Sequence, residues 1–197
     1  MVPRRFVLYG GTAIALRLGH RSSVDFDFFS TAPFVPADLP GEIEWLRGAE
    51  PLQSAPNTLT VMVQRHGPVK VSFFGGLGLG RVGDPEATPD RVLAVASLLD
   101  LAATKVAVIQ QRAERRDYLD LAALLTAGVG LDEALAAAQA LFRDQFNPMI
   151  SLKALSYFGD GDLPRLPDSV KQALSRQAAD LKRIPRLERR SDCLNLG

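Results

Sequence analysis

The fold is decided by residues 6–29, which read FVLYGGTAIALRLGHRSSVDFDFF. An apolar run leads into Gly10-Gly11, a short segment of helical periodicity follows, and a second apolar run carries Asp25 and Asp27. This order predicts a strand, a glycine turn, a helix and a second strand. Side chains at i and i+2 of a strand share one face, with Cα atoms about 7 Å apart. The two carboxylates therefore converge, while the phenylalanines that alternate with them point into the core.

Two carboxylates held this close repel each other, and a divalent cation relieves the repulsion. Mg²⁺ bound by one or two carboxylates plus substrate phosphates is usual at phosphoryl-transfer sites. Gly10-Gly11 precedes the predicted helix, where a phosphate meets backbone N–H groups and the positive end of the helix dipole. Alone, a Gly-Gly pair is more often an ordinary turn, and an Asp-x-Asp is usually the wet face of a strand. Together they indicate a nucleotide site with Asp25 and Asp27 as metal ligands.

The spacing of these motifs is Gly10-Gly11, thirteen residues, then Asp25-x-Asp27. It resembles the first motif of the polymerase-β-like nucleotidyltransferase superfamily. The full sequence of residues 8–29 is similar to that of the AbiEii/AbiGii toxin branch. A second match reads LAATKVAVIQQR over residues 101–112 and RDYLDL over residues 116–121. It resembles that family's helical lysine and the carboxylates after it. The resemblance covers residues 5–125.

The resemblance implies an α/β (α+β) fold, a nucleotidyltransferase-type mixed sheet with flanking helices, followed by a helical C-terminal half. It also implies an enzyme that moves a nucleotide from a nucleoside triphosphate to an acceptor, with Mg²⁺ (or Mn²⁺) as cofactor. Toxin relatives modify tRNA or other acceptors, so RNA, and tRNA in particular, is the expected acceptor. A toxin of a toxin–antitoxin or phage-defence system also implies an antitoxin protein as partner. Relatives usually carry a helix before the glycine motif, which raises the expectation of a truncated or mis-assigned start.

The composition fits this class and adds little to it. The 197 residues are 47% hydrophobic with a net charge of +1, enough for a good core and no global polycation. The single cysteine, Cys193, excludes an intramolecular disulfide and fits a reducing compartment. No apolar run approaches the length that spans a bilayer, so we expect no membrane partner and a cytoplasmic location.

The pattern divides the chain into two predicted parts. Residues 1–90 are predicted to form a nucleotidyltransferase-like α/β core, in which residues 58–64 and 69–74 form a β-hairpin. Residues 91–197 are predicted to form a helical region packed on that core. Its expected helices cover residues 93–112, 117–125 and 131–143, with two more beginning at Pro148 and Pro167.

Lys105 lies in the middle of an apolar helical stripe, which is costly unless the ammonium reaches solvent or a counter-charge. Asp117 and Asp120, three residues apart on the next predicted helix, share a face that offers such a charge. One interpretation is a buried ion pair that ties the two helices together. In the other, Lys105 binds the β/γ-phosphates of the nucleotide, and Asp117 or Asp120 orients it or contacts the acceptor. The resemblance favours the second, with Asp120 ahead of Asp117, and makes all three residues catalytic candidates.

The strand expected to carry a third carboxylate reads VKVSFF over residues 69–74 and contains no acid. In the superfamily this acid holds a metal and activates the attacking hydroxyl, and Ser72 stands in its place. A hydroxyl is a poor general base and a weak metal ligand. Three explanations stay open: Asp117 or Asp120 supplies the carboxylate, one metal suffices, or the domain binds nucleotide without turning it over.

The remaining candidates lie around the first motif and in the basic C-terminal stretch. The predicted nucleotide-binding residues, besides Lys105, are Gly10, Gly11, Thr12, Arg21 and Ser23. Arg21 and Ser23 have an alternative interpretation as plain turn residues. His20 and His66 have no partner at ligand spacing, so a zinc site is not expected. Residues 165–190 hold eight Lys or Arg against three acids, a footprint for RNA backbone or an ordinary solvated helix with a frayed end.

Two other functions stay open at this point. A small-molecule nucleotidyltransferase of the antibiotic-modifying kind would need no basic tail. A catalytically silent nucleotide-binding scaffold is favoured by Ser72.

Overall fold

The structure is a computed structural model that describes residues 1–196, and it divides into two compact units. The first unit contains Met1–Ser97 and residues 190–196, and the second contains Leu98–Arg189. The boundary predicted at residue 90 therefore lies inside the first unit, because a short strand that follows it still pairs with the sheet. The predicted assignment of the last residues to the helical part also differs, since they return to the first unit.

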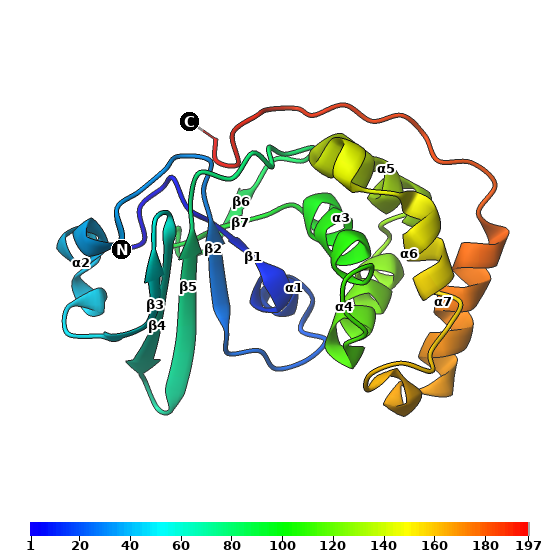
Figure 1. The fold of residues 1–197 in the computed structure, drawn as a ribbon, viewed down its shortest axis with the longest axis horizontal. Helices are drawn as coiled ribbons and strands as arrows, with labels where there is room; N and C mark the ends of the chain where they lie inside the picture. Colours follow the sequence, from blue (N-terminus) through cyan, green and yellow to red (C-terminus); the bar gives the residue numbers. More distant parts are fainter. Residues whose placement is uncertain (197) are drawn as a thin grey trace. The chain divides into compact units, whose positions relative to one another are not determined.

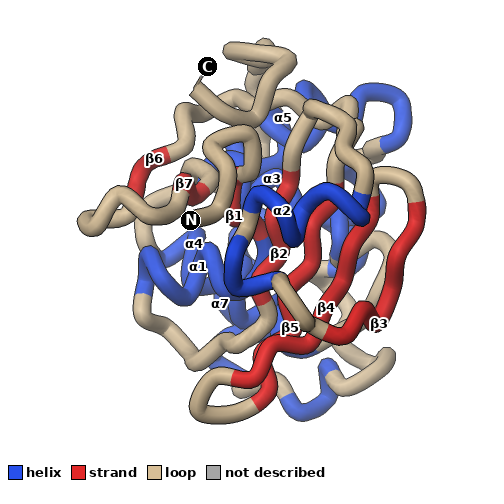
Figure 2. Tube along the Cα trace, turned by 90° about the vertical axis from the view of Figure 1, so that its left-hand side faces the viewer, coloured by secondary structure: helices blue, strands red, loops and turns tan. Residues whose placement is uncertain are grey.

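The first unit is built on a seven-stranded mixed sheet in the order β3-β4-β5-β2-β1-β7-β6. Figure 2 shows β1, β2, β5, β4 and β3 side by side in that order. The strands are β1 (Val7–Tyr9), β2 (Phe26–Phe29), β3 (Glu50–Ala55), β4 (Thr58–Gln64), β5 (Pro68–Phe74), β6 (Glu86–Ala87) and β7 (Ala94–Val95). The predicted mixed α/β fold is confirmed.

The pairing around β2 fixes which side chains share a face. β2 runs antiparallel to β1 and parallel to β5, so that Asp27 lies opposite Tyr9 on one side and Ser72 on the other. The predicted hairpin of β4 and β5 is present, with Thr60 opposite Ser72. Because a strand alternates its side chains, the positions of Asp25 and Asp27 share one face of the sheet with Ser72 and Thr60.

Three strands of the sheet, β3, β6 and β7, were not predicted from the sequence. β3 is exposed along its whole length, so it lacks the apolar alternation by which strands are recognised. β7 occupies residues that the helical spacing assigned to the start of the helix over 93–112, and the helix itself begins at Leu98. Two residues are too few to show a period of their own, and β7 is defined by its parallel pairing with β1.

The face of the sheet opposite the carboxylates forms the apolar core of the first unit. Phe28 stacks on Phe73 with ring centroids 5.2 Å apart, and Phe6 meets Phe73 edge-on at 5.1 Å. Helix α2 (Leu39–Glu42) and a following turn over Glu44–Leu46 add the buried side chains of Leu39 and Leu46. Phe28 is buried as expected, whereas Phe26 is only partly buried.

Helix α1 (Gly10–Leu18) follows β1 directly and ends at Gly19, whose φ of +63° suits glycine. Near its start, Thr12 is buried and its hydroxyl donates a hydrogen bond to the backbone oxygen of Asp25. The same hydroxyl lies 2.8 Å from Ser23 Oγ. Thr12 thus ties the start of α1 to the chain that enters β2.

The second unit is helical, as predicted (Figure 1). Its helices are α3 (Leu98–Val108), α4 (Arg115–Thr126), α5 (Leu131–Phe142), α6 (Pro148–Ala154) and α7 (Asp168–Asp180). The side chain of Asn147 caps α6 by accepting from the Met149 N–H at 3.0 Å, and Pro148 occupies the first turn. The Arg189 guanidinium donates to the carbonyl oxygens of Ala140 and Leu141 at the C-terminal end of α5.

The chain after Arg189 is anchored within the first unit. Arg81 Nη1 donates to the carbonyl oxygens of Cys193 and Asn195 at 2.5 and 2.7 Å, and Arg190 pairs with Asp84 at 3.1 Å. These bonds explain why the last residues leave the helical unit. Within residues 1–196 no single helix has the length and hydropathy of a membrane span; Arg115–Thr126 and Leu131–Gln145 reach them only as a pair bent by 117°.

We predict that Thr12→Val lowers the free energy of unfolding by about 1–3 kcal/mol, because the Asp25 carbonyl loses its partly buried donor while the side-chain shape is kept. Urea denaturation measures the change. The matched control is Thr126→Val, since that hydroxyl is exposed and bonds only within its own helix. Equal effects of the two substitutions would contradict the role given to Thr12.

Candidate active site

The Asp-x-Asp motif lies at the start of β2, beside the glycine turn. Asp25 directly precedes the strand, Asp27 lies within it, and both are only partly buried. A Cβ built on Gly10 would lie 2.8 Å from Asp27 Oδ2, and Gly10 has a φ of +73°. The Asp27 carboxylate therefore occupies the space that any other side chain at position 10 would need. This contact joins the two predicted halves of the site.

The start of α1 offers backbone donors beside this carboxylate. Tyr9, which precedes the helix, makes no side-chain cap hydrogen bond to it. The predicted phosphate-binding residues Gly10 and Gly11 are the first two residues of the helix. Thr12, also predicted, is only 2% exposed and its hydroxyl is engaged by Asp25 and Ser23, so it positions the turn.

The loop between α1 and β2 carries the other two predicted nucleotide-binding residues. Arg21 and Ser23 are both partly buried there. Arg21 Nη1 donates to the Ser22 carbonyl at 3.1 Å, and Ser23 contacts Thr12. The structure thus brings Ser23 to the glycine turn and holds Arg21 by its own loop; their contact with nucleotide stays a prediction.

The neighbouring strand β5 contributes two residues to the carboxylate face. Ser72 is 3% exposed, pairs with Asp27 across the strands and lies 3.3 Å from Thr60 Oγ1 through its own Oγ. Lys70, two residues earlier, has its Nζ 3.6 Å from Asp25 Oδ2. Ser72 was expected at this position. Lys70 was missed, because only the parallel register of β2 and β5 shows that it lies beside Asp25.

The chemistry of the carboxylate face fits a divalent cation that keeps open coordination positions. Within the described part of the chain, no group of three or more His, Cys, Asp and Glu side chains is placed to hold a metal ion. On this face Asp25 and Asp27 are the residues that would hold such an ion, and phosphate and water oxygens would fill the other positions that Mg²⁺ prefers. Because the Asp27 carboxylate fills the space above Gly10, a phosphate would approach beside this carboxylate, as a further ligand of the same cation.

The second predicted cluster lies within the helical unit, between α3 and α4. Lys105 Nζ is 2.6 Å from Asp117 Oδ1 and 2.7 Å from Asp120 Oδ2. Lys105 is 6% exposed, Asp117 2% and Asp120 0%. The interpretation as a buried ion pair is therefore what the structure shows, and it uses both carboxylates rather than one. Contact of Lys105 with a phosphate stays a prediction.

Arg112 extends this cluster and was not predicted as a site residue. Its Nε lies 2.7 Å from Asp117 Oδ2, on the carboxylate oxygen that Lys105 leaves free. Two cations thus face two acids, which balances the buried charge. Arg112 is the last residue of the helix predicted over residues 93–112, five residues before Asp117, and this proximity to Asp117 is the signal that would have found it.

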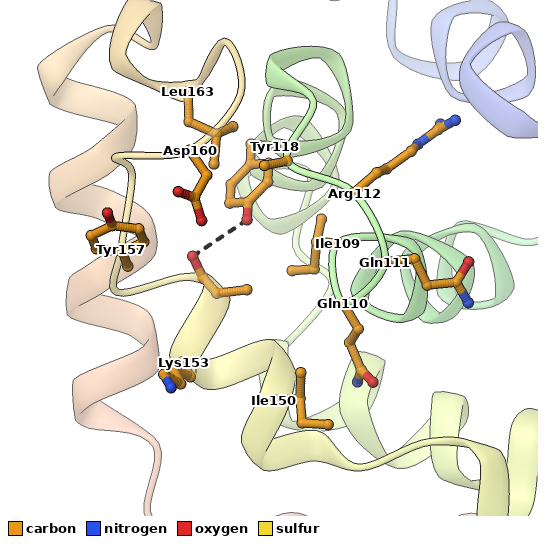
Figure 3. A pocket seen from close by; sticks show the side chains of 12 residues that line it. Ile109, Gln110, Gln111, Arg112, Tyr118, Ile150, Lys153, Tyr157, Asp160 and Leu163 are labelled. Carbon is orange, nitrogen blue, oxygen red and sulfur yellow. Dashed lines mark hydrogen bonds between the residues drawn. The ribbon is translucent and has the colours of Figure 1, made fainter.

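A pocket of about 350 Å³ borders the cluster inside the helical unit (Figure 3). Arg112 and Tyr118 line it together with Tyr157 and Asp160. Burial, with the negative charges of Asp117 and Asp160, raises the pKa of Tyr118 to about 12. Tyr118 is therefore a neutral phenol at pH 7, and its hydroxyl donates to the Ala154 carbonyl at 3.4 Å.

The fold has a counterpart among solved structures. The chain is similar to MenT4, the nucleotidyltransferase toxin Rv2826c from Mycobacterium tuberculosis H37Rv, with a TM-score of 0.59 and 16% identity. The similarity covers 91% of this chain and 77% of that one. At this identity the likeness establishes the fold alone.

Sequence comparison gives the class and then the family. The profile described as "Nucleotidyl transferase AbiEii toxin, Type IV TA system" matches residues 3–51 and 56–192. The protein is therefore a nucleotidyltransferase. More closely, it belongs to the AbiEii family of nucleotidyltransferase toxins of type IV toxin–antitoxin systems. An uncharacterized protein of Aquifex aeolicus (strain VF5), aq_aa25, is 32% identical over 158 residues, 79% of this chain and 74% of its own length. The predicted family and enzyme class are confirmed.

We predict that Lys105→Met lowers the free energy of unfolding by about 3–5 kcal/mol, because it leaves two buried carboxylates without their shared cation. Combining it with Asp120→Asn should recover most of the loss. Chemical denaturation is the measurement, and Lys153→Met, at an exposed lysine outside the cluster, is the control. A loss no larger than that of the control would contradict the ion-pair role.

Proposed function

We propose that the protein transfers a nucleotide from a nucleoside triphosphate to an RNA hydroxyl, using Mg²⁺ held by Asp25 and Asp27. The observation that carries this proposal is the contact of Asp27 with the space above Gly10. This carboxylate oxygen lies next to the first residue of α1, and the proximity supports the binding of a cation by Asp27 together with a phosphate at the helix start.

In this proposal the acceptor hydroxyl attacks the α-phosphate, and pyrophosphate leaves. Gly10 and Gly11 present backbone N–H groups to the phosphates, and Thr12 holds this turn against the entry to β2. The bound cation supplies charge neutralisation at the phosphoryl oxygens. Asp25 and Asp27 would hold this cation, and the turn formed by Gly10, Gly11 and Thr12 would position the triphosphate for in-line attack.

Lys105, Asp117 and Asp120 are proposed as a rigid charged unit in the second half of the protein. Lys105 has three N–H donors, and its two short carboxylate contacts fix the direction of the third. We propose that this unit acts on the β/γ-phosphates. Asp117 and Asp120 then act as positioning residues for Lys105.

The acceptor is proposed from the charge of the segment after α7. Lys182, Arg183 and Arg186 are exposed there. Lys182 and Arg183 also line a groove of about 600 Å³ together with Lys153 of α6. Exposed lysine and arginine side chains along a groove suit the phosphate backbone of RNA. Arg189, Arg190 and Lys171, in contrast, are engaged within the protein.

We predict that Mg²⁺ or Mn²⁺ with a nucleoside triphosphate raises the melting temperature of the wild-type protein, because the ligands neutralise the two carboxylates and bind only the folded state. Asp25→Asn combined with Asp27→Asn should abolish the shift and leave the fold intact. Asp38→Asn, at an exposed carboxylate of the same unit, is the control and should keep the shift. A shift that persists in the double variant would refute the assignment of the metal ligands.

We also predict that replacing Lys182, Arg183 and Arg186 by Gln weakens tRNA binding and flattens its salt dependence by up to about three units of ion release. Titrations at several salt concentrations measure the slope. Arg4, Arg47 and Arg65, exposed in the first unit, give a control with the same change in net charge when replaced by Gln. Equal slopes for both triple variants would remove the tail from the proposed RNA surface.

Labelled nucleoside triphosphates identify the acceptor. Label on RNA with the wild type, and none with Asp27→Asn, is the expected result. Label on a small molecule would favour the antibiotic-modifying alternative. Nucleotide binding without label on any acceptor would favour the silent scaffold that Ser72 first raised. The predicted antitoxin partner follows from the family and is proposed on that ground.

A further inference from the structure

Lys70 stands on the carboxylate face in a position that none of the roles above uses. β2 and β5 are parallel neighbours with Asp27 opposite Ser72, so the residues two places earlier on each strand also lie side by side. These are Asp25 and Lys70, and the Lys70 Nζ is 3.6 Å from Asp25 Oδ2. The exposed fractions of the two side chains are 43% and 45%, so both are accessible to a ligand.

The charge of this face suits one divalent cation rather than two. Asp25 and Asp27 are its acids at β2, and the β5 position that faces Asp27 carries the neutral, buried Ser72, which lies against Thr60. Lys70 adds a positive charge to the same face. A second divalent cation would therefore lack a carboxylate ligand from β5 and would meet the Lys70 ammonium instead.

The acids of the helical unit are not available to complete a two-metal site. Asp117 and Asp120 are buried, and both already face Lys105 at 2.6 and 2.7 Å. The second oxygen of Asp117 accepts from Arg112. Recruiting either acid as a metal ligand would leave a buried cation uncompensated, which is strongly unfavourable.

We infer that the site works with one divalent cation. Lys70 supplies the positive charge that a second cation would otherwise bring to the phosphates. Without nucleotide, Lys70 neutralises Asp25. When a cation and a triphosphate bind, the cation replaces Lys70 as the partner of Asp25. The freed ammonium then contacts the phosphate oxygens, to which a flexible four-carbon stem gives it reach. This inference rests on the function proposed above and assigns a substrate-binding residue to it.

The inference predicts opposite effects of Lys70→Met on two ligands. Mn²⁺ alone should bind about threefold more tightly, because the competing ammonium is gone, as expected for an exposed ion pair. A non-hydrolysable nucleoside triphosphate should bind about tenfold more weakly, because a charge-assisted hydrogen bond is lost. A lysine with a merely structural role would not separate the two ligands in this way. Lys171→Met, at a lysine that belongs to neither the proposed active site nor the RNA groove, is the control and should change neither affinity.

The number of bound ions gives a second, independent readout. Electron paramagnetic resonance of free Mn²⁺ should count one bound ion per wild-type chain in the presence of the triphosphate analogue. Lys70→Met combined with Ser72→Asp should bind two, because the ammonium is removed and a carboxylate is added beside Asp27. Melting curves verify that each variant is folded.

The results separate the role of Lys70 from the proposed function of the site. Two Mn²⁺ ions in the wild type, or triphosphate binding by Lys70→Met equal to that of Lys171→Met, would overturn the role of Lys70. Loss of binding in Asp27→Asn would still support the metal site in that case. Absence of Mn²⁺ and triphosphate binding by the wild type would overturn both the proposed function and this inference.

Discussion

The candidate site depends on one steric constraint. The Asp27 carboxylate occupies the space that a side chain at position 10 would fill. Asp27 Oδ2 lies 2.8 Å from the position of a Cβ on Gly10, whose backbone has a φ of +73°. Both conditions require glycine there. The Thr12 hydroxyl, bonded to the Asp25 backbone, holds the same turn from the other side. The start of α1 and the start of β2 therefore lie in direct contact, and the metal and phosphate roles proposed for them rest on this proximity.

The charged clusters of the two units differ in burial and in how closely their ions pair. In the first, the carboxylates are partly exposed and Asp25 pairs with the half-exposed Lys70 at 3.6 Å, a partner that a divalent cation can displace. In the helical unit, Lys105 is buried between two acids at 2.6 and 2.7 Å, an arrangement that is costly to break. One cluster is thus suited to exchange partners with a ligand, and the other to hold its geometry.

The family assignment and the structure support each other at different levels. The sequence profile covers nearly the whole chain and establishes the AbiEii nucleotidyltransferase toxin family, whereas the likeness to MenT4 establishes the fold. Within that fold, Ser72 faces Asp27 where the superfamily pattern led us to expect a third acid. The inference about Lys70 starts from this departure. With a serine in place of the acid and a lysine on the same face, the site is inferred to hold one cation rather than two.

The sequence alone determined the parts of this protein that depend on local chemistry. The glycine turn, the alternation around Asp25 and Asp27, the β4–β5 hairpin and the helices after residue 97 follow from spacing and periodicity over short stretches. The apolar neighbours of Lys105 also predicted an acidic partner for it, and the structure shows Asp117 and Asp120 in that position. Other features were decided only by the tertiary structure. The parallel register that sets Lys70 beside Asp25, the pairing of β7 with β1 and the return of residues 190–196 to the first unit are examples. Each of these joins segments separated by long stretches of chain, and no local pattern records which distant strand or arginine a residue will meet.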